Sequence, residues 1–352
     1  MESQQVMNDS TEASAITSSK NKPYRVLMVT GIYPTAARLD KGTYIKSQVD
    51  SLIAAGVEVE VIHPKPGPAP LRYARAFVQV FCKTLTGHYD IVHGHYGLWC
   101  LIARIQWTTP VVASFLGSDV LGVVTVDGSY STFGERVAHV SRWLCRHVDA
   151  VIVKSEEMKK AALGGKNIFV IPNGVDFELF RPIPRQQARA ALGWEQERSY
   201  ILFGNDPQRT VKNFPLAQAA VARLHERGVP AELVVANGLP HEKVVEYINA
   251  NNVLILTSHT EGSPNIVKEA MACNVPVVST DVGDVSEIIG RTAGCVVCPA
   301  DPDALATALE QALRYGAPTT GRVDIQRLDS SLVAQQVIAV YENVLNKKAY
   351  IS

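Results

Sequence analysis

The chain has 352 residues, in which 34 Lys and Arg balance 34 Asp and Glu, and 47% of the residues are hydrophobic. This composition excludes an intrinsically disordered protein, which combines low hydrophobicity with high net charge. It also argues against a nucleic-acid partner, because binding to a phosphate backbone selects a basic excess. The length predicts two domains.

Three features bear on location. No apolar run approaches the roughly 20 residues of a membrane span. The six cysteines lie mostly in apolar segments, and no signal peptide is recognisable. These features predict a reducing, cytoplasmic compartment. Residues 1–22 are polar and predict a disordered leader.

Apolar strands and amphipathic helices alternate through the first half of the chain. A strand, a helix and a second strand at its start are typical of a doubly wound parallel sheet. In chain order the apolar runs and helical periodicities predict strands at 25–30, 57–63, 91–93, 111–115, 150–154 and 168–171, and helices at 44–55, 71–85 and 132–146.

The alternation begins again after a proline-containing linker at 180–185. We predict strands at 200–204, 231–236, 253–257 and 275–280, and helices at 214–227, 241–249, 264–273, 302–315 and 331–346. The pattern predicts an α/β protein with two Rossmann-like domains, at 23–182 and 183–328, and a C-terminal helix and tail at 329–352. Because open α/β sheets bind ligands beyond the carboxyl ends of their strands, two sheets facing one crevice suggest a ligand with two parts.

The segment 260–270 (TEGSPNIVKEA) carries the most informative pattern. Ser263 suits an N-cap, and Pro264 suits the first helical position. The helix start would then offer an anion-binding site to the crevice, formed by the free N–H groups of Asn265, Ile266 and Val267. Glu261 and Glu269 flank this site and suit sugar hydroxyls. A capped surface helix with two solvated glutamates is the alternative for this spacing alone.

A basic loop follows the first strand of the second half. Arg209 and Lys212 come after Gly204, at the carboxyl end of the predicted strand. Two fixed cations there could neutralise a diphosphate leaving group. A solvated basic loop is the alternative.

Five segments of the chain, taken together in their order, resemble retaining glycosyltransferases of family 4, whose fold is the two-domain GT-B type. Glu261 and Glu269 match the family's E-x7-E signature, and the residues from Glu261 to Ile289 resemble its donor-site segment. The other four segments are DIVHGH (90–95), GSD (117–119), AVIVKSEEM (150–158) and VIPNGVD (170–176) with FRP (180–182). The resemblance extends from about residue 25 to residue 346.

The resemblance implies a nucleotide-sugar donor, UDP- or GDP-linked, as co-substrate, and neither a cofactor nor a metal. Glu269 would hold the ribose of the donor, and Glu261 would contact the transferred sugar. Arg209 and Lys212 would stabilise the departing diphosphate, with help from the helix start at 263–267. An oxocarbenium-like transition state needs a stabilised leaving group more than a strong base.

The resemblance implies further site residues in both domains. Gly42 and Thr43 are similar to a glycine-rich loop that approaches the diphosphate, and Gly204 belongs to the donor side. Asp119 and His95 would lie on the acceptor side, near the reacting carbon. The fold also implies that the C-terminal helix returns to the first domain.

The sequence departs from the family pattern in three places. Leu116 stands where many relatives have His, which leaves a histidine role there in doubt. Asn274 replaces a Gly but tolerates the same left-handed conformation. The second domain is short between 236 and 253, with the base-binding pocket expected near 237–240. This short form resembles members of cell-surface polysaccharide or teichuronic-type assembly.

Other metal-like signals have simpler explanations. Asp301-Pro302-Asp303 resembles a D-x-D motif, but its first Asp is predicted to cap a helix. Cys295 and Cys298 have metal-like spacing without a second Cys or His pair nearby, and are predicted to be strand residues. His93 and His95 share one strand face, where a metal site, an acceptor pocket and a structural role all remain open.

The segment 71–85 predicts a basic amphipathic helix. One stripe holds Arg72, Arg75, Gln79 and Lys83. Another stripe holds Leu71, Ala74, Val78, Phe81 and Leu85. Such a helix can rest on an anionic membrane surface, which would suit a lipid-linked acceptor at the inner membrane face. A helix that only covers the first sheet is the alternative.

The leading hypothesis is a retaining glycosyltransferase, hexosyl or related, that transfers a sugar to a hydroxyl of a glycan or lipid-linked acceptor. One alternative is a GT-B-fold sugar-nucleotide epimerase. The other is a non-catalytic partner that binds a nucleotide sugar or a glycan. The full set of charged donor-site residues argues against both.

Overall fold

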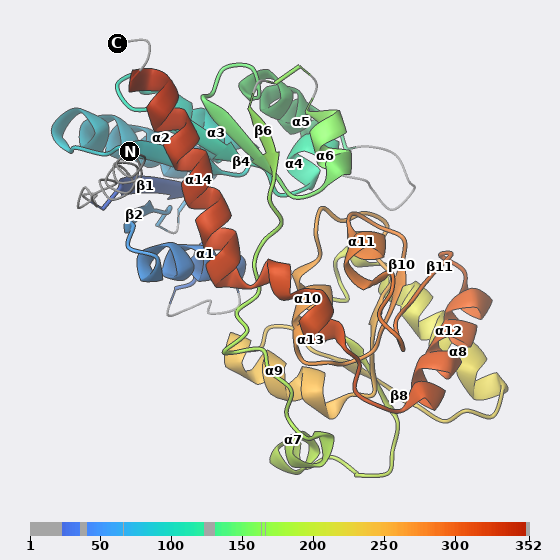
Figure 1. The fold of residues 1–352 in the computed structure, drawn as a ribbon. Helices are drawn as coiled ribbons and strands as arrows, with labels where there is room; N and C mark the ends of the chain where they lie inside the picture. The colour runs from blue at the N-terminus through green and yellow to red at the C-terminus, as the bar shows by residue number, and fades with distance from the viewer. Residues whose placement is uncertain are drawn as a thin grey trace, which may run out of the picture.

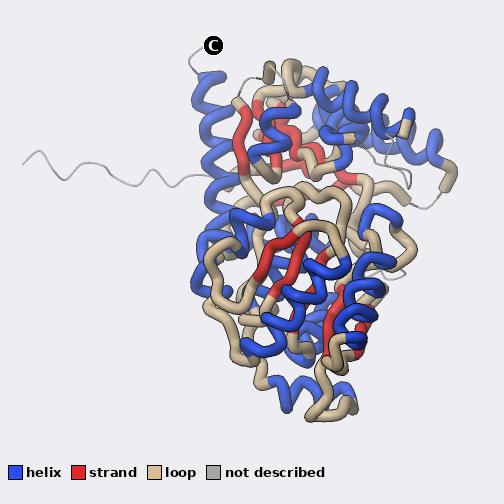
Figure 2. The backbone as a smooth tube through the Cα atoms, turned by 90° about the vertical axis from the view of Figure 1, so that its right-hand side faces the viewer, coloured by secondary structure: helices blue, strands red, loops and turns tan. Residues whose placement is uncertain are grey.

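The protein consists of two α/β domains joined side by side (Figures 1 and 2). The computed structural model describes residues 23–35, 41–65, 67–122, 131–162, 164–165 and 167–349. The predicted leader lies outside these residues. Within the described part of the chain, no helix is both long and apolar enough to cross a membrane.

The first domain contains a six-stranded parallel sheet in the order β2-β1-β3-β4-β5-β6. Its inner strands are mostly apolar and are buried along nearly their whole length, because helices cover both faces of the sheet. The strands are β1 (Arg25–Thr30), β2 (Glu58–Ile62), β3 (Ile91–His95), β4 (Val111–Ser114), β5 (Ala150–Val153) and β6 (Ile168–Val170). The helices are α1 (Thr43–Ala54), α2 (Ala69–Thr86), α3 (Gly97–Arg104), α4 (Ser118–Leu121), α5 (Thr132–Leu144) and α6 (Glu156–Ala161).

The second domain contains a five-stranded parallel sheet in the order β11-β10-β9-β7-β8. Its strands are β7 (Tyr200–Phe203), β8 (Glu232–Val235), β9 (Val253–Leu256), β10 (Val277–Thr280) and β11 (Val296–Cys298). Its α-helices are α7 (Arg185–Leu192), α8 (Phe214–Glu226), α9 (His241–Ala250), α10 (Asn265–Ala272), α11 (Val285–Ile289), α12 (Pro302–Tyr315) and α13 (Gly321–Asp324). Two 3-10 helices are η1 (Thr210–Lys212) and η2 (Gln326–Leu328).

The chain passes between the domains twice, and the two passages are hydrogen-bonded to each other. The backbone N–H of Val175 donates to the carbonyl of Leu328 at 2.9 Å, and the N–H of Ser330 donates to the carbonyl of Val175 at 2.9 Å. The C-terminal helix α14 (Ser330–Ala349) then lies across the first domain (Figure 1). There its apolar residues, among them Tyr341, join the core beneath α1. The predicted return of this helix is confirmed.

The strands and their parallel arrangement are as predicted, but several helices were missed. The segment of α3 (GLWCLIAR) is apolar on most sides, and the segment of α7 (RQQARAAL) has few apolar residues. Each segment is only eight residues long, which is too short for the helical period to be distinguished with certainty from a buried strand or a loop. Asn274 has a φ of 58°, which is the left-handed conformation that was expected.

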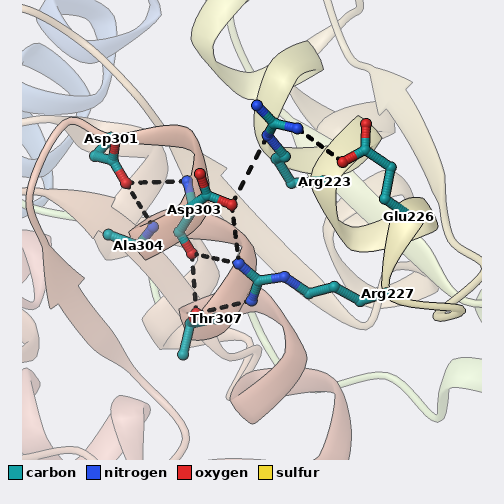
Figure 3. Close-up of polar contacts among 7 residues, drawn as sticks. All are labelled: Arg223, Glu226, Arg227, Asp301, Asp303, Ala304 and Thr307. Carbon is teal, nitrogen blue, oxygen red and sulfur yellow. Dashed lines mark hydrogen bonds and ion pairs between the residues drawn. The ribbon is translucent and has the colours of Figure 1, made fainter.

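The D-x-D-like segment is structural, as predicted. The carboxylate of Asp301 caps α12 by accepting hydrogen bonds from the N–H groups of Asp303 at 3.0 Å and Ala304 at 2.9 Å. The carboxylate of Asp303 pairs at 3.2 Å with Arg227, the residue that follows α8, and so helps to join α8 to α12 (Figure 3). The described residues hold no group of three or more His, Cys, Asp or Glu arranged for a metal.

Candidate active site

A cleft of about 560 Å³ opens between the two domains, beyond the carboxyl ends of their strands. The first domain contributes Thr43, Tyr44, Leu116, Gly117 and Ser118 to its lining. The second domain contributes Gly204, Arg209, Lys212, Glu261, Ser263, Asn265, Ile266 and Glu269. The fold thus brings together most of the residues that the sequence singled out, although they come from loops that are far apart in the chain.

The two domains touch across the cleft at a pair of glycines. A Cβ atom on Gly262 would lie 2.7 Å from the carbonyl oxygen of Leu116, and one on Gly117 would lie 3.4 Å from the backbone nitrogen of Gly262. Gly117 also has a φ of 140°, which side chains rarely tolerate. The loop before α10 therefore needs glycine to approach the loop after β4 this closely.

Lys212 and Glu261 form an ion pair inside the cleft. Their side chains are only 10% and 15% exposed. Ser258 donates a further hydrogen bond to Glu261 at 2.6 Å. Arg209 lies nearby in the cleft lining and is exposed. The pair fixes the lysine ammonium in a partly dehydrated position, where its charge acts more strongly than in water.

The start of α10 differs from the prediction. The helix begins at Asn265, and Pro264 occupies the N-cap position with a ψ of 116°. Ser263 lies before the N-cap and does not cap the helix; its hydroxyl accepts a hydrogen bond from the buried ammonium of Lys268 at 3.0 Å. The first-turn N–H groups still have no partner within the helix. Asn265 and Ile266 line the cleft, whereas the side chain of Val267 is fully buried in the core.

Glu269 is held by a residue that the sequence did not reveal. Nε2 of His241, the first residue of α9, lies 3.3 Å from Oε1 of Glu269. Burial alone would lower the pKa of His241, but the hydrogen bond to Glu269 and the nearby charges outweigh it and raise that pKa. His241 and Leu239 line the cleft at the place expected for the base-binding pocket. The place of His241 in the sequence, at the start of the helix after β8, is the signal that could have identified it.

Gly42 has the special conformation that its predicted loop requires. It caps α1 with a φ of 74°, and a Cβ atom there would lie 2.8 Å from the carbonyl oxygen of Ile32. Gly42 does not line the cleft, whereas the next residue, Thr43, does. Substitution of this glycine would therefore disturb the start of α1, where Thr43 lines the same cleft as Arg209 and Lys212.

Asp119 and His95 are both buried and do not line the cleft. The carboxylate of Asp119 accepts hydrogen bonds from the N–H groups of Leu116 at 2.9 Å, Gly117 at 2.9 Å and Gly97 at 3.2 Å. It therefore shapes the loop that touches the second domain. Burial raises its pKa to about 6.

His95 stacks on His93 with ring centroids 4.3 Å apart. The His93 ring is hydrogen-bonded at 2.7 Å to both Tyr341 and Ser114. Both ring nitrogens of His95 lack a hydrogen-bond partner among the described residues. Burial lowers its pKa, so the ring is neutral at pH 7. The pair links β3 to the C-terminal helix beneath the cleft.

Lys268 connects the cleft to the interdomain segment. Its side chain is fully buried, and its ammonium donates to the carbonyl of Asn173 at 2.8 Å as well as to Ser263. Burial lowers its pKa to about 8. Asn173 also donates to the side chain of Asn265 at 3.4 Å. The loop before α10 is thus tied to the first passage between the domains.

The raised pKa of Asp119 predicts a pH-dependent stability. Between about pH 3.8 and pH 6 the native protein binds more protons at this carboxyl than the unfolded chain does, so its contribution to stability falls as pH rises. Asp119→Asn does not titrate. We expect the unfolding free energy of the wild type, relative to Asp119→Asn, to fall by roughly 2 kcal/mol between pH 4 and pH 7. Urea denaturation at both pH values measures this difference, and an equal difference at both would contradict the prediction.

Two family models match adjoining parts of the chain. The model described as Glycosyltransferase Family 4 matches residues 42–179, and the model described as Glycosyl transferases group 1 matches residues 187–315. Together they include every predicted donor-site residue and most of both domains.

Curated relatives and solved structures agree with these models. The chain is 24% identical to the teichuronic acid biosynthesis glycosyltransferase TuaC of Bacillus subtilis, over 81% of this chain and 88% of that protein. It is 26% identical to the D-inositol 3-phosphate glycosyltransferase of Mycobacterium marinum, over 67% of this chain and only 58% of that protein.

Two solved structures resemble the whole fold. Sucrose-phosphate synthase from Thermosynechococcus elongatus superposes with a TM-score of 0.75 at 19% identity, covering 92% of this chain and 100% of that one. HepE of Anabaena, in complex with UDP-glucose, superposes with a TM-score of 0.62 at 17% identity, covering 91% and 99%. From the two family models and the shared two-domain architecture, the chain belongs to glycosyltransferase family 4 and has the GT-B fold.

Proposed function

We propose that the protein is a retaining glycosyltransferase that transfers a hexosyl or related sugar from a UDP- or GDP-linked donor to a hydroxyl of an acceptor. The observation that carries this proposal is the meeting of Lys212, Arg209, Glu261 and Glu269 with the start of α10 in one interdomain cleft. HepE of Anabaena was solved in complex with UDP-glucose, which supports a nucleotide sugar as the donor.

The donor's two phosphates fit the positive end of the cleft. Lys212 and Arg209 supply charge, and the first-turn N–H groups of α10 supply donors along the helix dipole. The carboxylate of Glu269 suits the ribose hydroxyls, because carboxylates accept strong hydrogen bonds. Glu261 would exchange part of its contact with Lys212 for a hydroxyl of the transferred sugar.

The contacts of the nearby carboxylates favour a reaction with retention of the anomeric configuration and without a carboxylate nucleophile. Asp119 is buried and accepts three backbone hydrogen bonds, so it is poorly placed to attack the anomeric carbon. Glu261 is paired with Lys212. We therefore infer that the acceptor hydroxyl attacks from the side of the leaving diphosphate, whose charge is stabilised by Arg209 and Lys212 without a metal.

The outer face of α2 supports an acceptor at a membrane surface. Its apolar side chains Leu71, Phe77, Val78 and Leu85 are 43–55% exposed. The indole of Trp107, 72% exposed, lies against the ring of Phe81 with centroids 6.0 Å apart. An apolar stripe beside basic residues is typical of interfacial helices, so we propose a peripheral position on the cytoplasmic membrane face, with a glycan or lipid-linked acceptor. TuaC, a glycosyltransferase of teichuronic acid biosynthesis, favours a cell-surface polymer.

The donor assignment is tested by thermal unfolding with a panel of nucleotide sugars. A specific donor stabilises the native state by mass action, so one or a few members should raise the Tm. Glu269→Ala should abolish that shift, whereas Lys243→Ala, which alters an exposed lysine on α9 paired with Glu246, should preserve it. The anomeric configuration of the product, read by NMR, then tests retention. No stabilisation by any nucleotide sugar would contradict the proposal.

A further inference from the structure

A basic pocket lies at the edge of the first sheet, apart from the residues of the interdomain cleft. It consists of two adjoining hollows of about 450 Å³ and 330 Å³ that share His63, Pro64, Lys65 and Arg72. The smaller hollow extends along α2 to Arg75 and Gln79, and the larger one extends to Ile32 and Tyr33 after β1. The pocket therefore lies where β1 and β2 end, which is where open α/β sheets bind their ligands.

The residues that line this pocket are basic or uncharged. None of the residues that line either hollow is acidic. Among the described residues, no ion pair reaches Lys65, Arg72 or Arg75. Lys83, on the same helix, is by contrast paired with Glu60 of β2. Among the described residues, Lys83 near the C-terminal end of α2 is thus neutralised, whereas Lys65, Arg72 and Arg75 have no ion pair near its N-terminal end.

The larger hollow and the cleft are connected through the contact between Ile32 and Gly42. Ile32 lines the larger hollow, and its carbonyl oxygen lies against Gly42. The next residue, Thr43, lines the cleft. A molecule that occupied both places would have its anionic part over α2 and its neutral part at the site of sugar transfer.

We propose that this pocket binds a phosphate or diphosphate group of the acceptor. The guanidinium groups of Arg72 and Arg75 match phosphate oxygens through paired hydrogen bonds, and Lys65 adds a point charge. His63, whose ring stacks on that of Tyr33 with centroids 5.6 Å apart, lines both hollows. The inference rests on the proposed glycosyltransferase function and names the chemistry of its acceptor. The phosphate belongs either to a lipid diphosphate or to a soluble sugar phosphate.

The test uses inorganic pyrophosphate as the probe in calorimetric titrations of the full chain. Pyrophosphate is expected to bind at two places, the cleft and the basic pocket. The variant Lys65→Gln/Arg72→Gln/Arg75→Gln should lose the second place, with binding there at least tenfold weaker, whereas Lys212→Ala should weaken the first. Arg136→Gln/Lys160→Gln removes two exposed cations of the same domain and should leave both places intact.

Two further arms identify the source of the phosphate. Phosphatidylcholine vesicles containing geranylgeranyl diphosphate should bind the wild type more tightly than the triple variant if the acceptor is a lipid diphosphate. Glucose 1-phosphate should compete with pyrophosphate if the acceptor is soluble. Either result supports the pocket.

Two results would overturn the inference. One is a single pyrophosphate site that Lys212→Ala removes. The other is a triple variant that loses only its binding to phosphatidylglycerol vesicles, which would make these cations a general membrane contact. Neither depends on the donor, because stabilisation by nucleotide sugars is measured separately and the triple variant should retain it.

Discussion

Lys212→Ala is expected to lower kcat by about 10²–10³-fold while leaving the fold intact. The substitution removes a charge that is 10% exposed in the cleft and is held in place by Glu261. If its stabilisation of the departing diphosphate is comparable to that of an oxyanion-hole donor, the loss is about 2.7–4 kcal/mol of transition-state energy. Steady-state kinetics with the donor found in the nucleotide-sugar panel measure the effect.

The matched control is Lys243→Ala, which removes an exposed lysine of the same domain that is paired with Glu246. Its kcat should match that of the wild type. Arg209→Ala should also remove most of the activity, because Arg209 lines the same cleft. Activity of Lys212→Ala within twofold of the wild type would remove this residue from the leaving-group site.

Lys268→Met is expected to lower kcat/KM by about 10²-fold, although the side chain does not line the cleft. The ammonium of Lys268 joins Asn173 to Ser263, and so holds the loop before α10 against the interdomain segment. Methionine keeps the length and apolar character of the side chain but cannot donate. A displacement of about 1 Å in a site can cost 10²-fold in rate, which sets the expected size.

Stability measurements separate positioning from unfolding. The unfolding free energy of Lys268→Met should fall by about 1–3 kcal/mol, because buried acceptors lose their donor. The pKa of Lys268 is lowered to about 8, so the unfolded chain binds more protons than the native one above that pH. The wild type should therefore gain stability relative to Lys268→Met between pH 8 and pH 10. A folded variant with normal kcat/KM would show that the contact is only structural.

Much of this protein was predictable because its local patterns have local causes. The run Arg25–Thr30 is predictable as a buried strand because helices cover both faces of a parallel sheet, so its strands are recognisable as continuous apolar runs. The order of strands and helices then fixes a doubly wound topology. The residues of the segment 260–270 lie on one loop and one helix start, so their spacing along the sequence already predicted which charges would line the candidate site.

Contacts between distant segments were not predictable in the same way. No local pattern in the sequence indicates that Lys212 pairs with Glu261, or that His241 holds Glu269. The prediction of Ser263 as the helix cap was wrong, since the helix begins at Asn265 after Pro264, and the Ser263 hydroxyl instead contacts Lys268. In each case the partner is chosen by how two elements pack, and single-sequence patterns do not carry that information.

The sequence by itself determined two α/β halves, the positions of their strands, and the short charged segments at the carboxyl ends. Backbone propensity and hydrophobic periodicity act over a few residues, and these features depend on little else. Only the tertiary structure decided which charges meet. It buried Asp119 and His95, paired Lys212 with Glu261, and left Lys65, Arg72 and Arg75 without an ion pair in the described part of the chain. Burial and pairing depend on the packing of whole elements, and that packing exists only in the folded domains.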